Sequence, residues 1–484
     1  MSTEIEPNLI GGDRITAQSG ATIPVHDPAT DEVIAQVPSC GQREAQQAIE
    51  AASSALPSWR ELPAQERSSY LEKLAALMRE RTETLARILT SEQGKPLAEA
   101  RGEIAYAASF IEWAAEEGKR VYGDMVPSSR RDHRILVLRQ PVGVVGIITP
   151  WNFPSAMITR KLGPALATGC TVVIKPAEQT PLSALELGKL CVEAGIPAGV
   201  VNILTGDPEQ ISDALLDDPR VRKMSFTGST EVGRILMAKG AKNLIRLSLE
   251  LGGHAPFLVF DDCDVDAAVK GALASKYRNA GQTCVCANRF YVQEGVYDEF
   301  RDKLAKQASE MRVGRGTDEG VQIGPLIDDS AMEKVEKHVA DALEKGAKML
   351  TGGDRVHLGD GFADRFYAPT VVEGFDHSML LAREETFGPL SPLRKFSHDD
   401  EAIELANDSP FGLAAYFYTR DAARLMRVAE RLEYGIVGAN DGVPSTVQAP
   451  FGGVKHSGFG REGGKYVMDE YLETKYVSWA LPQG

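Results

Sequence analysis

The chain has few cysteines, no long apolar run and a shortage of positive charge. Its 484 residues include 6 cysteines, too few for the disulfide framework of a small secreted protein. The longest clear apolar run, VGVVGII at 142–148, is much shorter than a membrane span and suits a buried strand. A formal net charge of −15 argues against a nucleic-acid backbone or an anionic membrane surface as partner.

The remaining composition is that of an ordinary globular protein. Apolar residues make up 43% and charged residues 25% of the chain, and the length predicts two or three domains. The N-terminal MSTEIEPNLIGG has no basic stretch followed by an apolar one and is too acidic for a transit peptide. We therefore expect a cytoplasmic protein.

Two of the cysteines stand two residues apart, in NAGQTCVCANR at 279–289. Cys284 and Cys286 could bind a metal, form a disulfide, fill a core or attack a substrate. A structural zinc site needs about four ligands, usually in spaced pairs, and no second pair or histidine cluster lies nearby in the sequence, so we expect no metal. The other cysteines are scattered and are predicted to be small buried residues: Cys40, Cys170, Cys191 and Cys263.

The secondary structure is predicted to change in character along the chain. Residues 42–118 place apolar side chains at helical spacing, as in Trp59, Leu71, Leu74 and Leu77, and read as amphipathic helices. Five short apolar strands then alternate with helices, at 142–149, 171–175, 200–204, 221–226 and 245–250. This alternation predicts an α/β fold with a doubly wound parallel sheet.

Two of the intervening helices have recognisable ends. In the helix at 180–195, Thr180 is a good N-cap, Pro181 suits the first helical position and Gly195 fits just past the end. In FTGSTEVG, Ser229 or Thr230 can cap the next helix, and Gly228 lets a pyrophosphate approach the backbone. The side chains predicted to hold that helix on the sheet are Val232, Ile235 and Leu236. Because the spacing departs from G-x-G-x-x-G, a simple tight turn is the alternative.

Polar residues and glycines follow each strand of the predicted sheet. Ligands bind outside the carboxyl ends of such strands. The residues found there are Asn152, Lys175 with Glu178, Gly206, Gly228 with Gly233, and Glu250. Together they have the composition of a nucleotide crevice, although Lys175 and Glu178 could also belong to a solvated charged loop.

Cys284 has the neighbours that a thiol nucleophile needs. Its own backbone N–H and the Asn152 amide could stabilise an oxyanion, and Glu250 could act as the base. No histidine motif lies near, which disfavours a cysteine–histidine hydrolase. A thiol and a carboxylate beside a nucleotide crevice indicate oxidation of a carbonyl compound through a thioester.

Seven motifs then occur in a familiar order: TPWNFP, KPAEQTP, FTGSTEVG, LELGGHAP, NAGQTC, EETFGP and PFGGVKHSGFGRE. With DPATDEVIAQVP at 27–38 and the C-terminal EYLETKYV, the chain resembles the aldehyde dehydrogenase superfamily over nearly its full length. CVCANR, ITRK at 158–161 and YRNAGQTC are most similar to succinate-semialdehyde dehydrogenases.

The resemblance implies roles for individual residues. Cys284 would be the nucleophile, Glu250 the base that activates the deacylating water, and Asn152 the oxyanion donor. The cofactor would contact Trp151, Lys175, Glu178, Gly228, Ser229, Glu385 and Phe387. Arg160, Arg278 and Ser445 would bind the substrate carboxylate, which the planar guanidinium suits. Without the resemblance, a surface or interdomain ion pair is the favoured interpretation of both arginines, because arginines are mostly exposed.

The resemblance also implies an organisation and an assembly. Residues 1–120 and 142–251 would form the NAD-binding domain and 252–450 the catalytic domain. Residues 121–141 and 451–484 would supply a β-arm and C-terminal segment for a homodimer or homotetramer. Glu178 should favour NAD over NADP, because a carboxylate accepts bonds from a ribose 2′-hydroxyl and repels a 2′-phosphate.

Three alternatives remain at this stage. Glutarate semialdehyde, one methylene longer, is an alternative substrate that sequence cannot separate from succinate semialdehyde. A non-catalytic binding protein on the same fold is a second alternative, disfavoured because Cys284, Glu250, Asn152 and Lys175 are all intact. Cys286 is either a small packing residue or the partner of Cys284 in a reversible inactivating disulfide.

Overall fold

Five parallel strands form the centre of the first sheet, at nearly the predicted positions. The computed structural model describes residues 5–482. The strands are β7 (Val144–Ile148), β8 (Thr171–Lys175), β9 (Val201–Ile203), β10 (Val221–Thr227) and β11 (Arg246–Glu250). Antiparallel β1 (Asn8–Ile10) and β2 (Asp13–Ile15) extend one edge and β21 (Gly458–Phe459) the other, giving the order β2-β1-β9-β8-β7-β10-β11-β21. The order reverses between β7 and β10, where a doubly wound sheet binds its ligand.

Helices cover both faces of this sheet, which explains the continuous apolar runs. Val172 and Ile174 of β8 belong to the core shared with α2, α4, α5 and α6, whereas Val173 belongs to the core shared with α1 and α7. The helices are α1 (Gln42–Glu61), α2 (Ala64–Glu80), α3 (Thr82–Gln93), α4 (Leu97–Gly118), α5 (Ala156–Thr168), α6 (Leu182–Glu193), α7 (Pro208–Asp217) and α8 (Thr230–Gly240). The predicted helical region is confirmed, with Trp59, Leu71 and Leu74 buried and Leu77 partly so.

The predicted N-cap of α6 is wrong. The helix begins at Leu182, and the backbone amides of Leu182 and Ser183 donate to the Glu92 carboxylate at 2.6 and 2.9 Å. The Thr180 hydroxyl donates instead to the Trp151 carbonyl. Glu92 lies at the end of α3, so no local pattern points to it. The other end agrees with the prediction, because Gly195 follows the helix with a φ of +84°.

The predicted contacts of α8 are only partly right. Ser229 caps the helix, accepting from the Val232 amide at 3.2 Å. Leu236 is buried, but Val232 and Ile235 are 41% and 47% exposed. The helix approaches the sheet through Gly233, where an added Cβ would come within 3 Å of the Leu251 side chain. The helix therefore faces the sheet with Gly233, where Val232 and Ile235 were predicted to lie, and these two side chains point outward.

A second α/β unit contains a seven-stranded sheet ordered β14-β15-β16-β13-β12-β18-β19. Every neighbouring pair is parallel except β14 and β15. The strands are β12 (Ala255–Val259), β13 (Ala287–Gln293), β14 (Lys348–Thr351), β15 (Thr370–Glu373), β16 (Leu390–Phe396), β18 (Ala414–Tyr418) and β19 (Ile436–Ala439). Its helices are α9 (Val265–Lys276), α10 (Tyr297–Ser309), α11 (Asp329–Glu344), α12 (Asp399–Asn407) and α13 (Ala422–Arg431). Short elements complete the chain: β3 (Thr22–His26), β4 (Val33–Pro38), β17 (Phe411–Gly412), β20 (Val454–Lys455) and α14 (Val467–Glu470).

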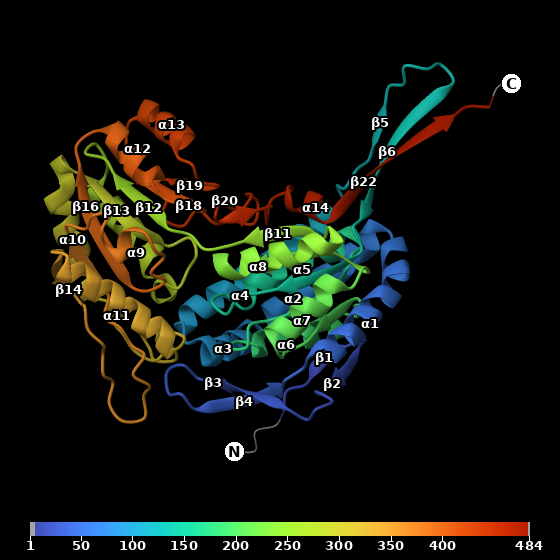
Figure 1. Ribbon diagram of the computed structural model, residues 1–484, viewed down its shortest axis with the longest axis horizontal. Coiled ribbons are helices and arrows are strands. Elements are labelled where there is room, and N and C mark those ends of the chain that lie inside the picture. Colours follow the sequence, from blue (N-terminus) through green and yellow to red (C-terminus); the bar gives the residue numbers. More distant parts are fainter. Residues whose placement is uncertain (1–4, 483–484) are drawn as a thin grey trace.

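A three-stranded arm projects from the first unit, at the upper right of Figure 1. It consists of β5 (Asp124–Val126), β6 (His133–Pro141) and β22 (Leu472–Ala480), all antiparallel. The region after residue 120 thus pairs with a strand near the end of the chain. Among residues 5–482, no helix is long and apolar enough to cross a membrane.

Candidate active site

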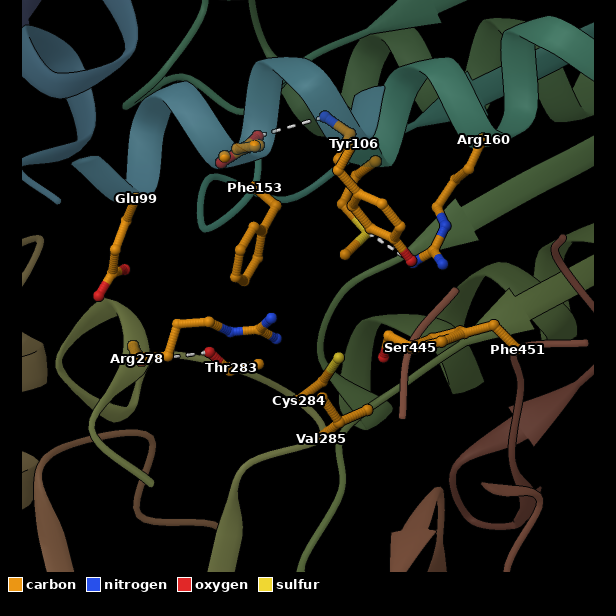
Figure 2. A pocket seen from close by; sticks show the side chains of 14 residues that line it. Glu99, Tyr106, Phe153, Arg160, Arg278, Thr283, Cys284, Val285, Ser445 and Phe451 are labelled. Atoms are coloured by element: carbon orange, nitrogen blue, oxygen red, sulfur yellow. Dashed lines mark hydrogen bonds between the residues drawn. The ribbon is translucent and has the colours of Figure 1, made fainter. Parts of the chain in front are cut away.

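A cavity of about 270 Å³ lies between the two units, with the Cys284 thiol on its wall. Figure 2 shows Cys284 flanked by Arg160 of α5 and Arg278 of the turn that leads to the thiol. Ser445 also lines this cavity. The volume is at the small end for ligand sites, which suits a small substrate.

Cys284 is held by a loop with an unusual backbone. Asn279, Ala280 and Gly281 have consecutive positive φ angles of 52°, 55° and 76°. A side chain at Gly281 would collide with the Gly388 carbonyl, so this position requires glycine. A residue of α4 also holds this loop: the Glu99 carboxylate accepts a hydrogen bond from the Asn279 backbone N–H at 2.8 Å.

Asn152 lies against this loop. Its Nδ2 donates to the Gln282 carbonyl at 3.0 Å, and its Oδ1 is buried without a partner. The Asn152 carbonyl accepts from Lys95 Nζ at 2.7 Å and from Asn279 Nδ2 at 3.0 Å. The structure therefore brings Asn152 to the nucleophile loop, two residues before Cys284.

A buried ion pair supports Asn152, and sequence reasoning missed it. Lys95 Nζ lies 2.6 Å from Glu103, with both side chains almost fully buried. The other Glu103 oxygen accepts from the Ser155 and Ala156 amides at the start of α5. The pair thus fixes the strand end, the Asn152 segment and α5 to one another. Lys95 has no local signal apart from its position in QGKP.

The two neighbouring thiols have different surroundings. Cys284 is partly exposed, whereas Cys286 is fully buried and accepts from Lys276 Nζ at 3.7 Å. Burial, reinforced by repulsion from Glu385, raises the pKa of Cys284 to about 12, with Arg160 acting in the opposite direction. Cys284 is therefore a thiol at neutral pH in the free protein and needs a base to react.

Glu250 is close enough for its charge to raise the pKa of Cys284. Both of its carboxylate oxygens are buried without a partner. Burial raises the pKa of Glu250 well above its usual value, and repulsion from Glu462 adds to this effect. A buried carboxyl group with free oxygens and a raised pKa is suited to accept a proton near neutral pH.

Glu462 and Lys161 form a buried pair beside Glu250 that sequence reasoning also missed. Lys161 Nζ contacts Glu462 and donates to the Thr227 hydroxyl at 2.5 Å. Glu462 also lies 3.0 Å from Arg160 Nε. It therefore links the C-terminal segment to the arginine of the cavity.

Arg160 is fixed in place, with part of its guanidinium free. The group lies over the Phe451 ring at 4.1 Å and the Phe110 ring at 4.8 Å. Arg160 Nη2 and the Tyr106 hydroxyl are both buried and have no hydrogen-bond partner within residues 5–482. Both residues line the cavity, and Figure 2 shows the hydroxyl and the guanidinium side by side. Tyr106 was not predicted, because an aromatic residue in an Ala-rich helix reads as core.

The predicted cofactor residues gather at the point where the strand order reverses. Trp151 follows β7, and Gly228 and Ser229 follow β10, with the Gly228 amide donating to the Glu250 carbonyl at 3.1 Å. Lys175, at the end of β8, contacts Glu178, as expected for an i,i+3 pair. Gly206, by contrast, pairs with Cys40. The strand edge and the capped start of α8 fit a dinucleotide phosphate.

Glu385 and Phe387 reach this region from the second unit. Glu385 accepts from the Gly253 amide at 3.0 Å, and burial raises its pKa to about 7. Phe387 has a φ of +56° and meets Trp151 edge-on, with ring centroids 5.5 Å apart. These predicted cofactor residues therefore lie close to Cys284. Within residues 5–482, no group of three or more His, Cys, Asp or Glu side chains is placed to hold a metal ion.

The model of the aldehyde dehydrogenase family matches residues 15–477. The chain belongs to the aldehyde dehydrogenase family. It is 56% identical to the succinate-semialdehyde dehydrogenase [NADP(+)] GabD of Escherichia coli, over 98% of this chain and 97% of that one. It is also 56% identical to a glutarate-semialdehyde dehydrogenase of Pseudomonas aeruginosa, over 97% and 96%. The crystal structure of succinate-semialdehyde dehydrogenase from Burkholderia pseudomallei is 56% identical and superposes with a TM-score of 0.96, each chain being covered to 98%.

The raised pKa of Cys284 in this aldehyde dehydrogenase predicts how the thiol reacts with alkylating agents. In the ligand-free protein, the rate of carbamidomethylation by iodoacetamide should rise about tenfold per pH unit from pH 7 to 9, because only the thiolate reacts. Mass spectrometry of the labelled peptide measures this rate, with Cys284→Ser as the control for the buried cysteines. A plateau below pH 8 would contradict the raised pKa.

Proposed function

We propose that the protein oxidises succinate semialdehyde to succinate with NAD(P), through a thioester on Cys284. The observation that carries this proposal is one small cavity containing a partly exposed thiol and two arginines. The family membership supports the reaction class. The arginines support an aldehyde with a carboxylate at its far end, because each can bind an anion through paired N–H groups.

In the proposed mechanism, residues of the cavity stabilise the negative charge on the substrate oxygen, and Glu250 accepts protons. The Cys284 thiol gives its proton to Glu250, which releases it to solvent, and the sulfur adds to the aldehyde carbon. The oxygen that becomes negative is held by Asn152 Nδ2 and the Cys284 backbone amide. Bound NAD(P) would supply the hydride acceptor, held by Lys175, Glu178, Glu385 and Phe387. Glu250 then takes a proton from the water that cleaves the thioester, so that Cys284 and the acid are released.

The substrate carboxylate is assigned to Arg160, Arg278 and Ser445, and we add Tyr106. Arg160 Nη2 and the Tyr106 hydroxyl are buried donors of the cavity wall that have no hydrogen-bond partner among residues 5–482. Leaving such groups unpaired costs free energy, and an anionic ligand would satisfy both. Arg278 stands over the Phe153 ring at 5.2 Å on the other side of the thiol. Glutarate semialdehyde remains the alternative substrate because it has the same end groups.

We further propose that the first sheet and its helices form the cofactor domain, that the second sheet forms the catalytic domain, and that the arm joins subunits. The arm supports this proposal because several large apolar side chains are exposed on or beside it, including Tyr122, Met125, Tyr476 and Trp479. Exposed apolar groups on a thin sheet are typical of surfaces that are covered in an oligomer.

The first test is NADH or NADPH formation with three aldehydes: succinate semialdehyde, glutarate semialdehyde and an uncharged aldehyde of similar length. Succinate semialdehyde should have the highest kcat/KM. Arg278→Ala should lower that kcat/KM by about 1.5–3 kcal/mol, the range for a charge-assisted hydrogen bond, and spare the uncharged aldehyde. Cys284→Ala serves as the blank.

Two outcomes of this test would contradict parts of the proposal. If Arg278→Ala lowered kcat/KM equally for charged and uncharged aldehydes, Arg278 would have a structural role and would not bind the substrate carboxylate. Near-normal turnover by Asn152→Ala would contradict the oxyanion role, since one such donor contributes about 2.7–4 kcal/mol.

A preference for NAD over NADP is proposed from Glu178. Its carboxylate contacts Lys175 and is about one third exposed, so it can accept from a ribose 2′-hydroxyl and repel a 2′-phosphate. The relative from Escherichia coli is named as an NADP(+) enzyme, and that name concerns the cofactor of that protein. Glu178→Ser should move the ratio of kcat/KM values toward NADP by about tenfold, the effect of removing one close like charge. A parent enzyme that already prefers NADP would refute the assignment.

The reversible Cys284–Cys286 disulfide stays a prediction. Cys286 lies against Lys276 and Asn288, so forming the bond requires its sulfur to leave those partners. Peroxide should inactivate the parent reversibly by dithiol. Cys286→Ala should recover less activity, because a sulfenic acid at Cys284 without a resolving thiol is oxidised by further peroxide to the irreversible sulfinic acid. Equal recovery of activity by the parent and by Cys286→Ala would contradict the disulfide hypothesis.

A further inference from the structure

His338 is a buried histidine outside the set of residues assigned above. It lies on α11, is fully buried and uses both ring nitrogens. Nδ1 is 3.1 Å from the Thr386 hydroxyl, and Nε2 is 3.3 Å from the Glu384 carboxylate. These two partners stand on either side of Glu385 in the chain. A single imidazole thus bonds to the residues before and after a proposed cofactor ligand.

The same face of α11 contacts this segment at two further levels. Asp341 accepts from the Leu380 amide at 2.7 Å, one turn after His338. One turn before it, Val335 packs against Gly388 so closely that a side chain there would collide with it. Residues three apart lie on one helix face, so 335, 338 and 341 form one row. His338 is the central polar contact of that row.

The segment needs such support because its conformation is not one that the chain adopts freely. Phe387 has a left-handed backbone, which a bulky residue adopts only when its surroundings impose it. Glu385 is partly buried and makes one hydrogen bond to the backbone, to the Gly253 N–H. Without further contacts, a carboxylate in this position would be free to turn away from the crevice.

The partners determine the tautomer of His338. A carboxylate only accepts, so Nε2–H donates to Glu384, and Nδ1 accepts from the Thr386 hydroxyl. Burial lowers the pKa of His338, and Lys334 and Lys337 on the same helix lower it further, while Glu384 opposes them. The neutral imidazole can therefore make both bonds at neutral pH.

We propose that His338 is the positioning residue that holds Glu385 and Phe387 in place for the nicotinamide half of the cofactor. This inference rests on the proposed function, which assigns Glu385 and Phe387 to that half. His338 touches neither cofactor nor substrate, and it acts through Glu384 and Thr386. The adenosine half, at Lys175 and Glu178, belongs to the other unit and should not depend on it.

The test compares two ligands by calorimetry: NADH, which needs both halves of the site, and ADP, which needs only the adenosine half. His338→Phe fills a similar volume but makes neither bond. It should weaken NADH binding about tenfold, the effect of losing one to two buried hydrogen bonds, and leave ADP binding within about twofold. In turnover, KM for the dinucleotide should rise by a similar factor, while KM for the aldehyde should change little.

Partial replacements separate the two bonds. His338→Asn can retain the contact of Nδ1 with Thr386, and His338→Gln can retain that of Nε2 with Glu384, so each should recover part of the NADH affinity. Thr386→Val and Glu384→Gln should give smaller losses than His338→Phe. Glu333→Ala, an exposed change on the same helix, is the matched control.

Three results would overturn the inference. Unchanged NADH affinity in His338→Phe would show that His338 does not position Glu385 and Phe387 for the cofactor. Equal losses of NADH and ADP would show general damage, with a lowered melting temperature as its sign. A parent protein that binds neither nucleotide would refute the proposed function and this inference with it, whereas binding by the parent with no effect of His338 would refute the inference alone.

Discussion

The left-handed turn from Asn279 to Gly281 is the constraint on which the site depends. Three consecutive residues with positive φ reverse the chain between α9 and β13 and present Cys284 to the cavity. The turn meets both units: Asn279 bonds to the Asn152 carbonyl and to Glu99 of the first, and Gly281 touches Gly388 of the second. Such a conformation costs free energy and persists because each residue is held from outside. The alignment of thiol, oxyanion donor and cofactor loop therefore depends on one loop that neither unit would hold by itself.

Burial controls the protonation of the reactive groups around that turn. It raises the pKa of Cys284 to about 12, that of Glu385 to about 7 and that of Glu250 well above its usual value. Repulsion from Glu385 and Glu250 also disfavours ionisation of Cys284, so the protonation of the thiol depends on both carboxyl groups. In the free protein Cys284 is thus mostly an unreactive thiol. Forming the thiolate requires a change in the charges around it, because Glu385 and Glu250 raise its pKa and Arg160 lowers it.

The parts of the fold that sequence predicts well are those whose cause is local. β7 and β8 are buried along their whole length, and their sequences VVGII and TVVIK show this as apolar runs. Ser229 caps the helix that directly follows it. The errors have distant causes. Glu92 caps α6 from another helix, and Gly233 turns Val232 and Ile235 outward because the helix lies too close to Leu251.

The residues that were missed follow the same rule. Lys95, Glu462 and His338 contact residues far away in sequence, namely Asn152, Arg160 and Thr386, and Tyr106 shares the cavity wall with Arg160. A single sequence contains no signal for such pairs. The motifs that were found are continuous stretches, in which the reactive residue and the glycines that shape its loop are neighbours.

Substrate length is the property that this geometry should control best. Relatives named for succinate and for glutarate semialdehyde are equally similar to this chain, so overall identity does not distinguish the two substrates. Arg160 is held by Glu462 and by two aromatic rings, and Cys284 is held by the turn. Both ends of the proposed substrate site are therefore fixed, and a carboxylate bonded to Arg160 would set how far the aldehyde can reach. One methylene changes binding by only about 1–3 kcal/mol even in a rigid pocket. Discrimination between the two semialdehydes must then come from the rigidity of these two anchors, since their chemistry is the same for both.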